Sequence, residues 1–141
     1  MSQFTMTING VAVGSDQQLS VLDPATGRPF AECPDCSETQ LDQAVRAAKA
    51  ALPAWRGDGE ARRAALMKCA DAIEAQAQAI APVLTQEQGK PLGKALEELY
   101  GAALWFRSTA ALPLEDQLLR EDENFRVELR RRPLGVVAGI T

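Results

Sequence analysis

Histidine is absent from this chain, and cysteine is rare. Without histidine, the chain supplies no Ser-His or Cys-His nucleophile pair and no histidine ligand for a metal. The three cysteines, Cys33, Cys36 and Cys69, are too few and too uneven in number for a disulfide framework. Such sparse cysteine use is typical of a reducing compartment, so the cytoplasm is the expected location.

Long apolar runs and an excess of positive charge are missing as well. The apolar stretches are far too short to span a bilayer, and no basic, apolar leader precedes Gly10, so neither membrane insertion nor secretion is expected. Lys and Arg total 15 against 19 Asp and Glu, a net charge of −4, which argues against a nucleic-acid partner. The apolar fraction of 46% excludes a disordered acidic tail.

Residues 1–33 predict an N-terminal β arm. Asn9-Gly10 stands between β-forming residues, which is a signal for a two-residue hairpin turn. Asp23-Pro24-Ala25-Thr26-Gly27 has the composition of a turn, because proline fixes φ and glycine accepts a positive φ. An extended segment is expected to resume over Pro29–Ala31.

Residues 37–113 predict an alanine-rich helical segment of three or four helices. Ser37 and Gln40 fit a capping box, and we expect the helix that they begin to end at Pro53. A second helix is expected from about Glu60, and Pro82 either kinks it or opens a new one. The residues expected on its inward face are Leu66, Cys69, Ala70, Ile73 and Ala77.

This second helix is expected to reach Gln88, with Gly89 as a left-handed residue just after it. That reading explains Gly89-Lys90 better than a phosphate-binding loop does, because a P-loop glycine follows a strand. A third helix is expected over Leu92–Leu112, with Pro113 as its terminator.

The C-terminal part changes to a period of two. Over 122–133, apolar and charged residues alternate as in a half-exposed strand, and the acidic stretch before it, around Leu118-Leu119, is expected to be a solvated linker. Residues 134–141 are apolar on both faces, which is typical of a strand buried in a parallel sheet. Since no neighbouring strand follows, we expect the chain to be a truncated piece of a longer α/β protein.

In this order, several segments resemble the N-terminal portion of the NAD(P)-dependent aldehyde dehydrogenase superfamily. The resemblance covers Ile8 to Thr141, nearly the whole chain. It is carried by Ile8-Asn9-Gly10, Asp23-Pro24-Ala25-Thr26-Gly27, Leu41–Ala51 with Pro53-Ala54-Trp55, Thr85-Gln86-Glu87-Gln88-Gly89-Lys90-Pro91-Leu92 and Arg132–Thr141. The Asp23 position usually holds asparagine in that family.

The resemblance implies an α/β fold in which residues 37–113 are a helical segment of the cofactor-binding domain. It also implies that residues 122–133 form an oligomerisation strand and that residues 134–141 form the first strand of a Rossmann-like dinucleotide-binding sheet. It implies an oxidoreductase that converts an aldehyde to a carboxylic acid with NAD or NADP, through a cysteine thiohemiacetal and a thioester. It also implies a homodimer or homotetramer. Ile140 and Thr141 resemble residues beside the cofactor, and no residue here matches the family's catalytic cysteine or general base.

Other motifs have plainer explanations. Cys33-Pro34-Asp35-Cys36 is a C-x-x-C before a helix, yet an isolated C-x-x-C is weak support for redox chemistry, and three cysteines without histidine cannot complete a zinc site. Cys69 is expected to be a buried, inert small side chain. Glu97 and Glu98 could hold a cation, but a solvated helix face explains them better.

Three hypotheses follow from the sequence. The first is an aldehyde dehydrogenase represented by an N-terminal piece that lacks its nucleophile and is inactive alone. The second is a non-catalytic helical assembly module or a truncated relic of such an enzyme. The third is a small C-x-x-C redox protein. The apolar residues 134–141 favour the first hypothesis over the second.

Overall fold

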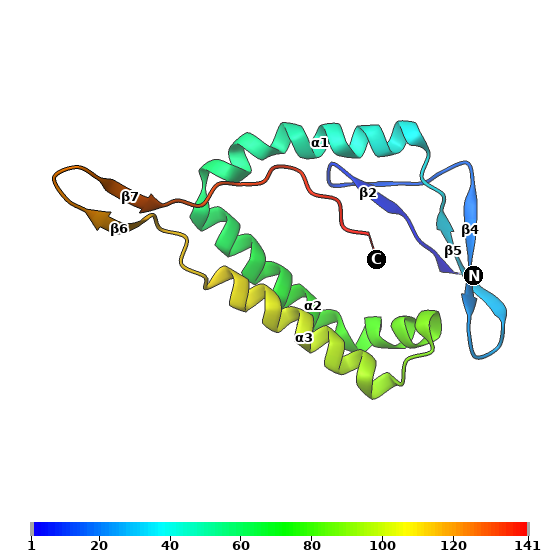
Figure 1. Ribbon diagram of the computed structural model, residues 1–141. Helices are drawn as coiled ribbons and strands as arrows, with labels where there is room; N and C mark the ends of the chain where they lie inside the picture. Colours follow the sequence, from blue (N-terminus) through cyan, green and yellow to red (C-terminus); the bar gives the residue numbers. More distant parts are fainter. Residues whose placement is uncertain (1, 141) are drawn as a thin grey trace.

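The computed structural model describes residues 2–140 and places three long helices between two groups of short strands. In Figure 1, α2 and α3 lie side by side, α1 runs along the opposite side of the molecule, and the last residues pass between them. This mixed architecture confirms the α/β class. The elements are β1 (Ser2–Gln3), β2 (Met6–Ile8), β3 (Val11–Val13), β4 (Gln18–Asp23), β5 (Arg28–Pro34), α1 (Glu38–Gly57), α2 (Gly59–Gln88), α3 (Leu92–Ala110), β6 (Gln117–Glu121) and β7 (Arg126–Leu129).

Two turns organise the N-terminal arm as the sequence predicts. Strands β2 and β3 form an antiparallel hairpin, and its turn residues Asn9 and Gly10 have φ values of 52° and 78°. Both values are positive, as a type I′ turn requires. Strand β5 lies between β4, to which it is antiparallel, and β1, to which it is parallel. The β4–β5 turn closes through the Gly27 amide, which donates to the Asp23 carbonyl at 2.8 Å.

The predicted capping box begins α1. The Ser37 hydroxyl accepts the Gln40 amide proton at 3.3 Å, and the Gln40 side-chain oxygen accepts the Ser37 amide proton at 3.1 Å. The Gln40 side-chain nitrogen also donates to the Gly14 carbonyl at 2.7 Å. One side chain therefore caps the helix and ties it to the N-terminal arm.

Helix α1 does not end at Pro53, contrary to the sequence prediction. It continues to Gly57 with Pro53 inside it. A proline removes the hydrogen bond to the carbonyl four residues earlier, which here belongs to Lys49. Lys49 and Pro53 are both exposed, so water can hydrate that carbonyl. The helix ends at Asp58, where the Arg62 guanidinium donates to the carbonyls of Trp55 and Arg56 at 2.6 and 3.0 Å.

Helix α2 contains Pro82 and bends rather than breaking into two helices, and its last turns run at an angle to the rest in Figure 1. Asp58 caps its start by accepting the Ala61 amide proton at 2.8 Å. Gly89 ends it with a φ of 73°, and its amide donates to the Thr85 carbonyl at 2.8 Å. The predicted left-handed terminator is thus confirmed.

The interface between α2 and α3 is built from alanine. All seven buried apolar residues of the described chain are alanines, and six of them lie on these two helices. Small side chains let helix backbones approach closely. Arg107 of α3 crosses the interface to Asp71 and Glu74 of α2, with N–O distances of 2.9 and 2.6 Å. The Glu74 carboxylate, followed by Asp71, raises the pKa of Arg107 above its ordinary value.

Because the buried residues are alanines, the larger side chains remain partly exposed to solvent. Cys69, which was expected inside, is exposed, because the inward face of α2 is narrow and centres on Ala70, Ala77 and Ala81. Trp105 on α3 is 75% exposed. No side chain larger than alanine is fully buried within the described residues.

The stretch around Leu118-Leu119 is a strand, which corrects the expected linker. Strand β6 pairs antiparallel with β7, and the hairpin projects from the helices in Figure 1. Asp122 accepts the amide protons of Asn124 and Phe125, both at 2.9 Å. The Asn124 amide is the main cause of a lowered pKa for Asp122, so this carboxylate stabilises the turn above its ordinary titration range and ceases to do so as the pH falls through the lowered pKa.

Residues 134–140 do not form the expected strand, and Thr141 lies outside the described residues. None of the backbone amides or carbonyls from 134 to 140 has a backbone hydrogen-bond partner within the described chain. A buried parallel strand needs neighbours on both sides, and the described residues place none beside this segment. The segment is apolar, bends at Val136 and is unpaired.

We expect Gly89→Ala to lower the free energy of unfolding by about 1–2 kcal/mol, because an L side chain is disfavoured at positive φ. The added Cβ would also lie 3.1 Å from the Pro24 Cγ. Gly93→Ala is the matched control, since Gly93 is helical and an added Cβ there meets open space. It should raise stability by about 0.5–1 kcal/mol. Urea denaturation measures both changes, and equal effects would contradict the assignment.

Candidate cofactor-binding segment

The segment after β7 lies along the apolar face of α1. Val136 and Val137 share a cavity of about 240 Å³ with Ala48, Leu52 and Trp55 of α1. In Figure 1 the segment runs beside α1 and its end points into the space between α1 and the α2–α3 pair. A helix covering a segment of this composition is the local arrangement found on one face of an α/β sheet.

Gly135 sets the direction of this segment. Its φ is +112°, a conformation that L side chains rarely adopt, and it is half-buried against Trp55. Leu134 before it is 95% exposed. The chain therefore turns at Gly135 from the exposed end of the hairpin toward α1.

Of the two predicted cofactor residues, the structure describes one. Ile140 is 96% exposed and has no described hydrogen-bond partner, and Thr141 lies outside the described residues. At this exposure, Ile140 is not packed into a site with other side chains of the described residues.

All three cysteines are free thiols, and Cys36 and Cys69 are exposed. Strand β5 runs through Cys33 to Pro34, and the Asp35 amide donates to the Gln17 carbonyl at 2.9 Å, so the chain stays extended toward Cys36. Three residues of extended chain span about 10 Å, whereas Cα atoms joined by a disulfide lie less than about 7 Å apart. This geometry does not favour the C-x-x-C redox hypothesis.

The carboxylates considered for a cation are engaged in ion pairs. Glu97 binds Lys94 at 2.6 Å, and Glu98 binds Lys90. Within the described residues, no three potential ligands gather in a group that could hold a metal ion. The same residues contain no helix with the length and hydropathy needed to cross a bilayer.

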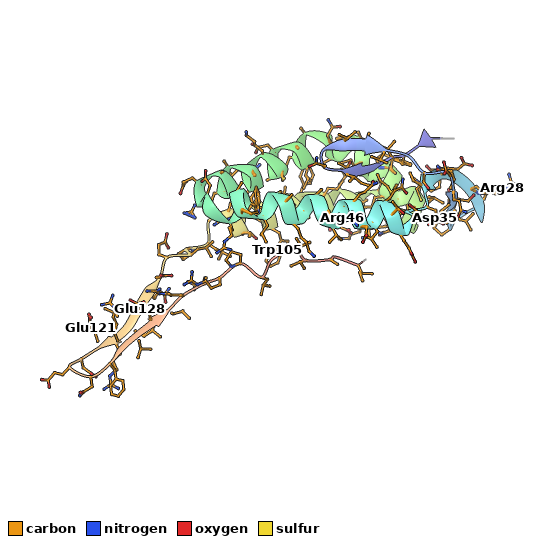
Figure 2. The ribbon with its side chains drawn as sticks, turned by 90° about the horizontal axis from the view of Figure 1, so that it is seen from above. Arg28, Asp35, Arg46, Trp105, Glu121 and Glu128 are labelled. Atoms are coloured by element: carbon orange, nitrogen blue, oxygen red, sulfur yellow. The ribbon has the colours of Figure 1, made fainter. Side chains whose placement is uncertain are left out.

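The projecting β6–β7 hairpin has two different faces. Figure 2 shows Glu121 and Glu128 on this arm, away from Asp35 and Arg46 on the main body. On the charged face, Arg126 binds Glu121 at 2.5 Å and Glu128 at 2.7 Å. Hydrogen bonds from Arg126, and then from Arg130, lower the pKa of Glu128. Phe125, Val127 and Leu129 alternate with these charges and remain exposed on the other face.

Comparison with known proteins decides the family. The sequence model of the aldehyde dehydrogenase family matches residues 11–141. The chain belongs to the aldehyde dehydrogenase family. It is 38% identical over 140 residues to a protein of a Pseudomonas species named "Probable aldehyde dehydrogenase", covering 99% of this chain and 29% of that protein.

Two further relatives extend the comparison. One is a "Probable succinate-semialdehyde dehydrogenase [NADP(+)]" of Sinorhizobium fredii, 33% identical over 132 residues, which covers 91% of this chain and 27% of the relative. The other is the crystal structure of succinate-semialdehyde dehydrogenase from Burkholderia pseudomallei, with a TM-score of 0.78, 31% identity, and coverage of 87% of this chain and 27% of that one. The chain thus spans under a third of the length of the relatives that it matches.

The family resemblance was readable from the ordered motifs, but the strand β6 was not. Its sequence, Gln117–Glu121, holds only two consecutive apolar residues and a run of charges. The sequence signal for β6 lies in its partner, β7, whose apolar and charged residues alternate clearly. A strand such as β7 needs a partner, so the preceding segment can pair with it even though its own sequence does not alternate.

We expect oxidation with diamide to leave Cys33 and Cys36 unlinked, because β5 and the Asp35–Gln17 hydrogen bond favour an extended chain, whose Cα atoms three residues apart exceed the reach of a disulfide. Peptide mapping by mass spectrometry after alkylation measures the linkage. Cys33→Ser is the control for peptide assignment. Recovery of a Cys33–Cys36 crosslink at high yield would restore the redox hypothesis.

Proposed function

We propose that the polypeptide to which this chain belongs oxidises an aldehyde to a carboxylic acid with NAD or NADP. Family membership over residues 11–141 is the observation that carries this proposal. Because the chain spans about 29% of its Pseudomonas relative, the activity is proposed for the complete polypeptide. The name of the Sinorhizobium relative supports NADP as one of the two cofactors.

In this proposal the described residues position the cofactor-binding segment and take no part in making or breaking bonds. In the proposed reaction, a cysteine thiolate outside this chain attacks the aldehyde carbonyl, and a thioester is later hydrolysed. NAD or NADP, when bound, accepts the hydride. In this chain, Val136 and Val137 line one cavity with α1, and the unpaired backbone around Ile140 is available to a neighbouring strand or to the cofactor.

Residues 134–141 are therefore proposed as the first strand of the dinucleotide-binding sheet, formed when neighbouring strands pair with it. Ile140 and Thr141 are proposed to lie beside the cofactor. This proposal is supported by the backbone of residues 134–140, which makes no backbone hydrogen bond within the described chain and so presents amides and carbonyls that can pair with further strands.

The β6–β7 hairpin is proposed as an oligomerisation element in a homodimer or homotetramer. Phe125, Val127 and Leu129 present an exposed apolar row on a hairpin that projects away from the helices. Such a row is a natural contact for a second copy. The cytoplasm is the proposed location, since Cys33, Cys36 and Cys69 are all free thiols.

The remaining alternative is a non-catalytic helical assembly module or a truncated relic. It would share the α2–α3 packing but would require residues 134–140 to function without partner strands. The apolar composition of that segment favours the enzyme, because an unpaired apolar edge promotes aggregation.

The complete polypeptide should reduce NAD or NADP when given an aldehyde, whereas residues 1–141 alone should not, because they lack a nucleophile and a general base. Absorbance of the reduced nicotinamide measures turnover across an aldehyde panel that includes dicarboxylic semialdehydes. Turnover by residues 1–141 alone would refute the proposal that the nucleophile and the general base lie outside these residues. A complete polypeptide that binds no nicotinamide cofactor would favour the assembly module.

Val127→Lys in the complete polypeptide should lower its oligomeric mass, because it places a charge in the apolar row of the hairpin. Leu118→Lys is the matched control: Leu118 pairs with Glu128, on the opposite face. Light scattering coupled to size-exclusion chromatography measures both masses. If Val127→Lys leaves the mass unchanged, the apolar row is not a subunit contact.

A further inference from the structure

A second cavity lies where the α1–α2 junction meets the chain leaving β7. Its volume is about 480 Å³, within the range of small-molecule sites. Leu52 and Trp55 of α1 and Leu114 form its apolar wall. Trp55 is 48% exposed, so a ligand can reach it.

Four arginines line the same cavity, and they come from three parts of the chain. Arg56 ends α1, Arg62 lies in the first turns of α2, and Arg131 and Arg132 follow β7. No carboxylate lines the cavity within the described residues. This concentration of positive charge is not a product of composition, because the chain as a whole carries −4.

The hydrogen bonds already made leave much of this charge available. Arg62 donates to the carbonyls of Trp55 and Arg56, and in doing so it offsets the negative end of α1. Arg131 makes one long contact, 3.4 Å, to the Glu115 carbonyl. The guanidinium groups of Arg56 and Arg132 have no hydrogen-bond or ion-pair partner among the described residues.

Two acids near the α1–α2 junction are already engaged. Glu60 pairs with Arg63 at 3.1 Å, and Asp58 accepts the Ala61 amide proton. Elsewhere in the described chain, Arg107 and Arg126 each bind two carboxylates. The cavity therefore gathers four guanidinium groups in a lining that contains no carboxylate among the described residues.

We propose that this cavity binds an organic phosphate. A phosphoryl group carries close to two negative charges and accepts paired hydrogen bonds from the planar arginine fork, so it suits Arg56 and Arg132 facing one space. The apolar or ring-shaped body of the ligand lies against Trp55, Leu52 and Leu114. Gly135, at the start of the C-terminal segment, also lines this cavity, whereas Ile140 does not, and the proposal does not depend on aldehyde oxidation.

The test uses phenyl phosphate, which combines a ring and a phosphoryl group, and isothermal titration calorimetry on the complete polypeptide. Saturating NAD and NADP are present throughout, so that a cofactor pocket does not contribute. We expect Arg132→Gln and Arg56→Gln each to weaken binding by about tenfold or more, the effect of losing one charge-assisted hydrogen bond. Neither side chain has a described partner, so the fold should be retained; circular dichroism checks this.

Arg46→Gln is the matched control, since it makes the same change of charge on α1 at an exposed arginine paired with Asp42. It should leave the affinity within about twofold of the parent, because its charge lies in solvent and is screened. Phenol should bind far more weakly than phenyl phosphate, and inorganic phosphate should bind more weakly because it lacks the ring.

Three results would overturn the proposal. The first is no binding of phenyl phosphate at millimolar concentration, as when another part of the polypeptide fills the cavity. The second is equal loss of affinity in Arg46→Gln and Arg132→Gln. The third is equal binding of phenol and phenyl phosphate, which would make the cavity a purely apolar one.

Discussion

Close contact between α2 and α3 through alanine is the constraint on which the rest of the structure depends. The six buried alanines on these helices allow the backbones to approach, and Arg107 locks the pair by binding Asp71 and Glu74. Because alanine buries little surface, this interface leaves the larger apolar side chains at least partly uncovered. The helices therefore form a firm support whose outer faces are suited to contact with further structure.

Two groups of exposed apolar residues each lie together on the surface. Trp55 and the valines at 136 and 137 gather along α1, while Phe125, Val127 and Leu129 form a row on the hairpin. The first group lines the cavity between α1 and the C-terminal segment, and the second lies on the projecting hairpin. The contacts that we propose for these two surfaces differ in kind, one with further strands and one with a second copy of the chain.

Local signals in the sequence were reliable. The capping box at Ser37, the Asn9-Gly10 turn and the terminator at Gly89 each depend on residues within a few positions, and the structure confirms all three. The errors came from interactions across longer distances or from solvent. Pro53 remains helical because water reaches the carbonyl it leaves unpaired, and Cys69 is exposed because the buried face of α2 is narrower than its apolar pattern.

The candidate site was harder to predict because its geometry depends on partners. The family could be read from ordered motifs, but whether residues 134–140 form a strand depends on neighbours that the described chain does not contain. The four-arginine cavity gave no sequence signal, since Arg56 and Arg132 are far apart in the chain. Only the path of the chain after β7 brings them to one space.

The hydrogen bonds of Gln40 restrict which residues can replace it more than a capping box alone would. Glutamate serves as well as glutamine at this position of a capping box, because only an acceptor is needed. Here the side-chain nitrogen also donates to the Gly14 carbonyl, 26 residues earlier in the chain. A glutamate would keep the cap but would place a carboxylate oxygen against the Gly14 carbonyl. The helix would still begin at the same residue, but the hydrogen bond that joins it to the N-terminal arm would be lost.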